Sequence, residues 1–218
     1  MGHLAVALAG KRAAPSVSLG WLMAAVCASD LLWPIFLLLG WEQVRIVPGA
    51  TPFTPLVFDS YPWSHSLLMG CVWGAALAAL GRWRGIPSRG ATLLALLVLS
   101  HWALDFVSHA PDMPLWPGPS PRLGLGLWRS IPGTFLVEGT LWIASIALYL
   151  RLRRPAKGLG QAAFWSLVIV CTAMWAAGPW TPPPPSPRAL AWFALIGWII
   201  FPWAALADRH AVPGKAAG

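Results

Sequence analysis

Residues 91–109 read ATLLALLVLSHWALDFVSH, and this stretch decides the fold class. Its only titratable side chains are His101, Asp105 and His109, and the residues before His101 are almost entirely apolar. A bilayer core about 30 Å thick is crossed by about 20 predominantly apolar residues in a helix. The stretch therefore predicts a membrane-spanning helix that carries polar groups in one half.

The composition of the whole chain indicates a membrane protein. Of the 218 residues, 57% are hydrophobic and only 10% are charged, whereas soluble domains carry about 25% charged residues. The net charge of +8 does not indicate nucleic-acid binding, because the basic residues form no single face and cluster at the ends of apolar runs. We expect one membrane domain over residues 1–218, embedded in a lipid bilayer and without a nucleic-acid partner.

Apolar runs elsewhere in the chain predict an all-α, polytopic transmembrane helix bundle with about six spans. The first run follows Lys11 and Arg12 and continues to Leu39, beyond the roughly 7–15 residues of a signal-peptide core. We therefore interpret it as a retained helix. The motif-bearing part covers about residues 1–140, and residues 160–218 add two further spans. The predicted spans are residues 17–39, 65–80, 91–109, 134–150, 162–177 and 189–206.

The basic residues predict the orientation of these spans. Eleven of the 15 Lys and Arg residues fall in alternate loops on one side of the bundle, and the other four fall on the opposite side. Because cytoplasmic loops carry the excess of Lys and Arg, we expect both termini in the cytoplasm of a bacterial-type inner membrane. Loops 41–64 and 111–132 would then lie on the outer side.

Ionisable groups inside spans are the most informative residues, since each costs about 2.5–3.5 kcal/mol at a helix centre and such residues are usually functional. His101, Asp105 and His109 recur every four residues, so they lie on one stripe of the helix. Each step rises about 6 Å, so His101 and Asp105 can share one metal ion, whereas His101 and His109 cannot. His109 would therefore join a second ion or a substrate.

Other titratable residues are expected in the outer half of the same bundle. Asp30 lies inside the first predicted span, where Pro34 one turn later would loosen the helix. The remaining candidates lie at or near the outer ends of spans: Asp59, His65, Asp112 and Glu138. Their convergence favours a metal or catalytic site over ordinary interfacial polarity.

His3 lies eight residues before Lys11, which is about 12 Å if the segment is helical. Two interpretations of residues 1–10 remain open. The segment is either a surface segment in the cytoplasm or a half-helix that enters the bundle. A half-helix would bring His3 to the level of Asp30 and His101, so His3 is included among the candidate metal ligands.

Five short motifs form a recognisable pattern in roughly the first 120 residues. They are Gly2-His3-Leu4, Ser29-Asp30-Leu31-Leu32-Trp33-Pro34, Ser64-His65-Ser66-Leu67-Leu68, Leu99-Ser100-His101-Trp102-Ala103-Leu104-Asp105 and Met113-Pro114-Leu115-Trp116-Pro117. In these motifs the chain resembles the YdjM-like family of membrane-bound, predicted metal-dependent hydrolases. Gly124-Leu125-Gly126-Leu127-Trp128, followed by Glu138, resembles a marker of one branch of that family.

The chain departs from the family pattern in two motifs. The family motif in the first span is Asp-x-Asp-His-Pro, of which only Asp30 and Pro34 are present. The family motif His-Arg-Gly-x-Thr-His-Ser keeps only its final His65-Ser66. Ligands that the resemblance implies for a second metal are therefore missing. Either other residues replace them, or this divergent branch binds one metal or none productively. The candidates for replacement are Asp59, His109 and Asp112.

These residues lead to the hypothesis of a metal-dependent hydrolase that acts on a lipid-linked or phosphoester substrate from the outer leaflet. One or two divalent ions, zinc by ligand type, would lower the pKa of a bound water toward about 7. Asp112 or Glu138 would act as general base, and Arg122 and Arg129 would hold a phosphate. The predicted metal ligands are His3, Asp30, His65, His101, Asp105 and His109.

Two other classes of function remain as alternatives. Intramembrane His and Asp residues also serve proton or metal transporters, although the candidate residues do not continue to the cytoplasmic side and no inverted repeat is visible. The third alternative is a non-catalytic membrane scaffold in which the polar cluster only packs helices. Loss of His101 or Asp105 would abolish metal binding under the first hypothesis and would change only stability under the third.

Overall fold

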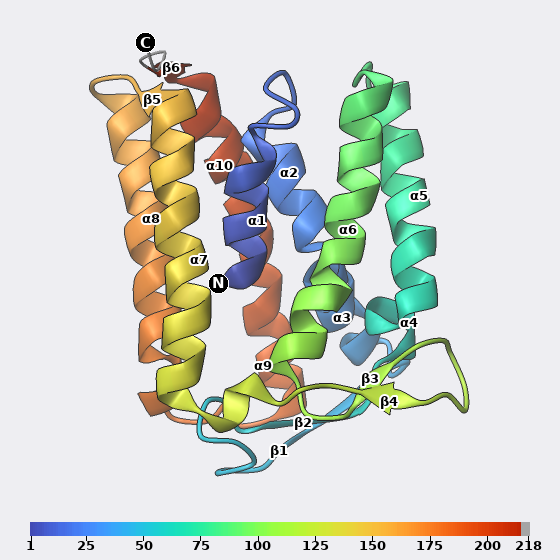
Figure 1. Cartoon of the computed structure of the whole chain (residues 1–218). Coiled ribbons are helices and arrows are strands. Elements are labelled where there is room, and N and C mark those ends of the chain that lie inside the picture. Colours follow the sequence, from blue (N-terminus) through green and yellow to red (C-terminus); the bar gives the residue numbers. More distant parts are fainter. Residues whose placement is uncertain (215–218) are drawn as a thin grey trace.

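The computed structural model describes residues 1–214 as a bundle of helices that mostly run along one direction (Figure 1). Short antiparallel strand pairs lie at the ends of the bundle. The helices are α1 (Gly2–Gly10), α2 (Leu19–Val26), α3 (Ala28–Leu38), α4 (Pro62–His65), α5 (Leu67–Trp83), α6 (Ser88–Ser108), α7 (Ile131–Leu152), α8 (Leu159–Ala177), α9 (Pro187–Leu195) and α10 (Ile200–Arg209). The 3₁₀ turns are η1 (Leu127–Arg129), η2 (Gly178–Trp180) and η3 (Ile196–Ile199). The strands are β1 (Gln43–Ile46), β2 (Leu56–Ser60), β3 (Met113–Pro114), β4 (Arg122–Leu123), β5 (Arg153–Pro155) and β6 (Ala211–Pro213).

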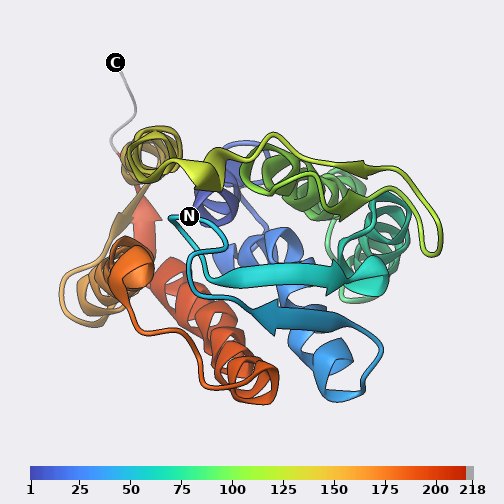
Figure 2. The ribbon, with the colours of Figure 1, turned by 90° about the horizontal axis from the view of Figure 1, so that it is seen from below.

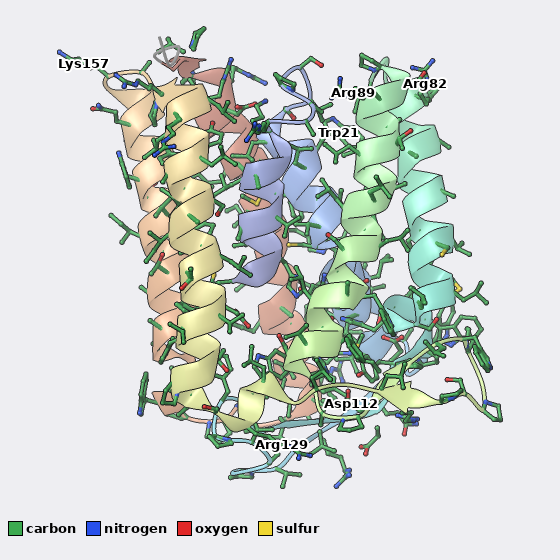
Figure 3. All side chains as sticks on the ribbon, in the orientation of Figure 1. Trp21, Arg82, Arg89, Asp112, Arg129 and Lys157 are labelled. Carbon is green, nitrogen blue, oxygen red and sulfur yellow. The ribbon has the colours of Figure 1, made fainter. Side chains whose placement is uncertain are left out.

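The two ends of the bundle differ in the residues they carry. The upper end in Figure 1, here called the basic end, holds the turns that follow α1, α5 and α7, and Arg82, Arg89 and Lys157 lie there (Figure 3). The opposite end, here called the hairpin end, holds the pairs β1–β2 and β3–β4, with Asp112 and Arg129 nearby (Figure 3). The loops with many basic residues lie at one end and the other loops at the opposite end, as predicted. The side of a membrane that each end faces stays a prediction.

Within residues 1–214, four helical segments are long and apolar enough to cross a membrane. They are α6, α7, the run Leu159–Trp180 and the run Pro187–Arg209, which contains α9, η3 and α10. The bent pair α2–α3 counts as a fifth span if its halves are taken together. Helix α5 is apolar but has only 17 residues. The prediction of a helical membrane protein is therefore supported in its coarse form, and the predicted count of six is not reached by these criteria.

The first predicted span is not one continuous helix. Helix α2 ends at Val26 and α3 begins at Ala28, with a bend of 55° between them. Cys27 at the bend has φ −100° and ψ 10°, outside helical geometry. Pro34 was expected to loosen this span, but it lies inside α3. Because of the bend, α3 leaves the axis of α2 and lies nearer the hairpin end (Figure 1).

Helix α1 lies inside the bundle, which decides between the two interpretations of residues 1–10. The N-terminus is about halfway along the bundle, and α1 runs from there toward the basic end (Figure 1). The helix packs against α2, α6 and α7, and Ala5, Ala7 and Leu8 are buried in the main hydrophobic core. Because the helix carries only small and aliphatic side chains after His3, it can be enclosed on all sides.

The predicted outer loops contain strands, which the all-α prediction did not anticipate. β1 and β2 pair in antiparallel fashion, with Val44 opposite Phe58, and β3 pairs with β4. Viewed from the hairpin end, the β1–β2 pair lies across the bundle (Figure 2). Trp33, Val44, Tyr61 and Met113 form a second, smaller buried cluster beneath it. This cluster fixes the loops over the end of the bundle where the candidate site lies.

Candidate metal centre

Five of the six predicted metal ligands converge from four helices. His3 comes from α1, Asp30 from α3, His65 from α4, and His101 and Asp105 from α6. Ligand atoms of His3, His101 and Asp105 all lie within 4.8 Å of one another, and so do those of Asp30, His65 and His101. His101 belongs to both groups and is fully buried.

The two carboxylates bridge the histidines. Asp105 Oδ2 lies 3.0 Å from His101 Nε2 and 3.7 Å from His65 Nε2, while Asp105 Oδ1 lies 3.0 Å from His3 Nε2. Asp30 Oδ1 lies 3.6 Å from His65 Nε2 and 3.8 Å from His101 Nε2. The four-residue spacing of His101 and Asp105 therefore brings their polar atoms together on one stripe of α6, as predicted.

The backbone fixes the orientation of the His101 ring. His101 Nδ1 lies 2.7 Å from the carbonyl oxygen of Val26, at the bend between α2 and α3. Because a carbonyl can only accept, Nδ1 carries a proton, and in the neutral ring Nε2 therefore carries a lone pair. Nε2 is buried and has no hydrogen-bond partner among residues 1–214, although Asp105 Oδ2 is 3.0 Å away. Two acceptors at that distance repel each other unless a proton or a metal cation lies between them.

A serine and a glutamate fix the His65 ring in the same way. Ser64 Oγ donates to Glu42 Oε2 at 2.6 Å, so it accepts from His65 Nδ1, which is 2.7 Å away. In the neutral ring, His65 Nε2 is thereby left as a lone-pair donor toward Asp30 and Asp105. Glu42 also accepts from the backbone amides of Trp63 and Ser64, each at 2.8 Å.

Glu42 is not among the site residues predicted from the sequence. Only its position directly after an interfacial Trp, together with the scarcity of acidic residues in the chain, could have drawn attention to it. Its side chain is buried, and burial raises the pKa of this carboxyl despite the hydrogen bonds that it accepts. The carboxylate lies outside the cluster and supports it through Ser64.

His109 lies at the edge of the cluster. Its Nε2 is 3.9 Å from Asp105 Oδ1, and its Nδ1 is 3.1 Å from Asp112 Oδ1. Asp112 Oδ1 also accepts from the hydroxyl of Tyr61, which is buried beneath the hairpin. His109 is therefore held by Asp112 with its Nε2 directed to the cluster. Tyr61 was not identified from the sequence, since a Tyr beside a predicted interface is ordinary.

Glu138 reaches the same region from α7. Its Oε2 accepts a hydrogen bond of 2.6 Å from the amino group of Met1, and both groups are buried. The pair joins α1 to α7 beside His3. The Oε2 atom of the general base predicted for this position is therefore already engaged by Met1.

Arg122 and Arg129 do not lie in the site. Both side chains are exposed, and Arg122 Nη2 donates to the backbone oxygen of Asp59 at 3.1 Å. Asp59 forms a bidentate pair with Arg45, at 2.7 and 2.8 Å, which lowers the pKa of the Asp59 carboxyl. The structure therefore does not bring Asp59 to the ligand cluster either.

A cavity of about 260 Å³ opens beside the cluster. Asp30, whose side chain is 52% exposed, faces it. The other titratable side chains that line it are His3, His65, Asp105, His109 and Glu138, whereas His101 lies behind the lining. Aromatic and aliphatic side chains form the apolar part of the lining: Trp33, Phe53, Leu56, Phe58, Trp128 and Trp175. Within residues 1–214 no Lys or Arg lines it.

No protein-family model, curated protein or solved structure matches the chain.

Proposed function

We propose that the protein is a membrane-embedded hydrolase whose site is built around a divalent metal ion, with zinc as the preferred ion. The observation that carries this proposal is the placement of His101 Nε2 against Asp105 Oδ2 at 3.0 Å, with the other ring nitrogen already donating to Val26. Imidazole nitrogens and carboxylate oxygens are the usual zinc ligands. The other ligands in this proposal are His3, Asp30 and His65.

Supporting residues favour a metal ion over simple helix packing. Histidines that bind metals almost always donate their second ring nitrogen to a carbonyl, carboxylate or similar group, which fixes the tautomer. His101 meets this requirement through Val26, and His65 meets it through Ser64 and Glu42. In both histidines a hydrogen bond from Nδ1 leaves Nε2 directed at Asp30 and Asp105. A network that only packs helices would not require this arrangement twice.

When bound, the metal would supply a water of lowered pKa and polarise the bond to be broken. The proton acceptor that geometry favours is His109, because its Nε2 faces Asp105 while Asp112 holds Nδ1. Asp112 then acts as a positioning residue rather than as the base itself. In this proposal His109 is therefore not a metal ligand, although the sequence predicts it as one. Glu138 is not the base but holds the start of α1.

The cavity supports a substrate with an apolar portion, in keeping with a lipid-linked compound or a phosphoester that carries an apolar group. Much of its lining is aromatic or aliphatic. Since Arg122 and Arg129 lie outside the cavity, charge on the scissile group would be met by the metal. These two arginines therefore have no part in the proposed site.

The membrane arrangement proposed here has six spans. Helix α5 packs along α6 through Gly70 and Gly74, and its 17 residues reach the lower limit of about 17 for a span. The basic end is proposed to face the cytoplasm and the hairpin end the outer side of a bacterial-type inner membrane. The motifs favour a divergent branch of the YdjM-like family.

A conduit for protons or metal ions has less support. From the cluster toward the basic end, the centre of the bundle is filled by buried apolar residues. These include Leu8, Leu22, Val26, Leu94 and Leu97. Such a layer interrupts the chain of polar groups that a relay would need.

Elemental analysis of the detergent-purified protein tests the proposal. Wild type, His101→Ala and Asp105→Ala are compared. His210→Ala is the matched control, because His210 is exposed and directly follows the C-terminal end of α10. We expect one or two equivalents of zinc or another late divalent metal in wild type and in the control, and none in the two site variants. Absence of metal in wild type after reconstitution would refute the metal centre.

A further inference from the structure

A second cavity is larger than the one beside the cluster, and none of the five proposed metal ligands lines it. It is a groove of about 840 Å³ at the hairpin end, between the end of α3, strand β1 and the start of α9. Volumes of about 300–1,000 Å³ are typical of sites for small ligands. We call it the α3–α9 groove. Its lining includes Leu37, Leu38, Arg45, Arg188 and Trp192, together with the acidic residues Glu42 and Asp59. Glu42 is engaged by Ser64 and Asp59 by Arg45.

Arg188 gives the groove a positive group without a partner. It is exposed, and it forms no ion pair and no side-chain hydrogen bond with residues 1–214. Arg45 on the opposite wall is 64% exposed and pairs with Asp59 through Nε and Nη2, so its Nη1 is not engaged in that pair. A guanidinium fork is suited to a phosphate because it donates several hydrogen bonds in a plane.

A stripe of α9 and η3 continues from Arg188 into apolar surface. Trp192 and Ile196 follow at four-residue steps and Ile199 three residues later, so they lie on one side of the helix. These three side chains are 56%, 60% and 58% exposed. Trp192 is about 6 Å deeper than Arg188 along the helix, which is the order of charged and aromatic residues expected at a membrane interface.

We propose that the α3–α9 groove binds a phospholipid of the leaflet at the hairpin end. Arg188 and Arg45 hold the phosphate, Trp192, Leu37 and Leu38 contact the glycerol region, and one acyl chain follows Ile196 and Ile199. The order of polar and apolar surface along the stripe matches the order of these parts in the lipid. The proposal requires that the chain lies in a bilayer, and it does not depend on the metal centre.

The test is native mass spectrometry of the detergent-purified full chain titrated with dioleoyl phosphatidylglycerol. Arg188→Ala is compared with Arg89→Ala, an exposed arginine at the basic end (Figure 3). We expect Arg188→Ala to weaken lipid binding about tenfold, the scale of one charge-assisted hydrogen bond. Arg89→Ala should bind like wild type. Equal binding by wild type and Arg188→Ala would overturn the proposal.

Two further measurements identify the part of the lipid that is recognised. Dioleoylglycerol has the same chains without the phosphate, and we expect it to bind at least tenfold more weakly; equal binding would overturn the proposal. Inorganic phosphate should not displace the lipid, because it lacks the apolar contacts, and displacement would assign the groove to a free anion instead. His101→Ala should keep wild-type lipid binding, so that failure of the metal centre and failure of the lipid site are told apart.

Discussion

Lys11 Nζ donates a hydrogen bond of 2.6 Å to Asp208 Oδ2, and both side chains are buried, at 2% and 6% exposure. The two residues are 197 positions apart, and their pair fastens the end of α1 to α10. Asp208 also accepts from the amide of Leu19 and from the hydroxyl of Tyr149. Because α1 carries His3, this pair at the basic end holds the helix that delivers a ligand to the cluster.

Asp208→Ala should therefore destabilise the protein strongly. It leaves the Lys11 ammonium buried without its partner, and breaking a buried pair in this way typically costs about 3–5 kcal/mol. The free energy of unfolding is measured by denaturant titration in detergent. The double variant Lys11→Met/Asp208→Leu should recover part of the loss because no buried charge remains. A double variant as unstable as Asp208→Ala would show that the charge pair is not the cause.

Ser64→Ala should weaken metal binding without abolishing it. The change removes the hydroxyl between His65 and Glu42, so the His65 ring loses the group that fixes its tautomer. Supporting groups of this kind are worth about 10–100-fold in metal affinity, and competition with a zinc chelator measures the change. Ser66→Ala is the control, since Ser66 caps α5 through the amide of Met69. Equal affinities of the two variants would contradict the role of Ser64.

The sequence identified the residues on α6 but not the groups that orient them. The four-residue spacing of His101 and Asp105 is a property of any helix, so their meeting could be predicted. The bend at Cys27 could not be predicted, because neither Gly nor Pro occurs there. Pro34 indicated a distortion two turns later in the sequence instead. Glu42 was missed because its contact with Ser64 depends on how the 41–64 loop folds back over the bundle.

The placement of α1 was only partly predictable. The distance from His3 to Lys11 gave the correct depth for His3, but it assumed that Lys11 marks a membrane surface. Lys11 is instead buried against Asp208, a contact between the two ends of the sequence that local patterns do not reveal. His109 was assigned to a metal on spacing alone, and its link to Asp112 through the turn after α6 changes that role in the proposal.

Gly20→Ala should disturb the contact between α2 and α10. A Cβ at Gly20 would lie 2.6 Å from the carbonyl oxygen of Phe201 and 2.8 Å from the Cβ of Ala205, so one helix has to shift. Overpacking of this kind costs about 1–3 kcal/mol, measured as free energy of unfolding. Gly70→Ala is the matched change on α5, where the nearest atom of Leu99 would be 3.6 Å away. It should be neutral or stabilising, since Ala favours helix more than Gly. Equal effects of both changes would contradict the close α2–α10 approach.

His109→Gln distinguishes a proton acceptor from a metal ligand. If His109 acts as base beside the metal, the variant keeps its full metal content and loses at least about a hundredfold in hydrolysis rate. The rate is followed with p-nitrophenyl phosphate, or with whichever phosphoester wild type turns over in a screen. Asp112→Asn should also keep the metal and shift the pH profile of the rate, because it alters the group that holds His109 Nδ1. Loss of metal from His109→Gln, with retention in Asp112→Asn, would return His109 to the ligand set. The metal centre would then have a sixth ligand, and the proton acceptor would have to be sought among the other groups that line the cavity, with Glu138 first among them.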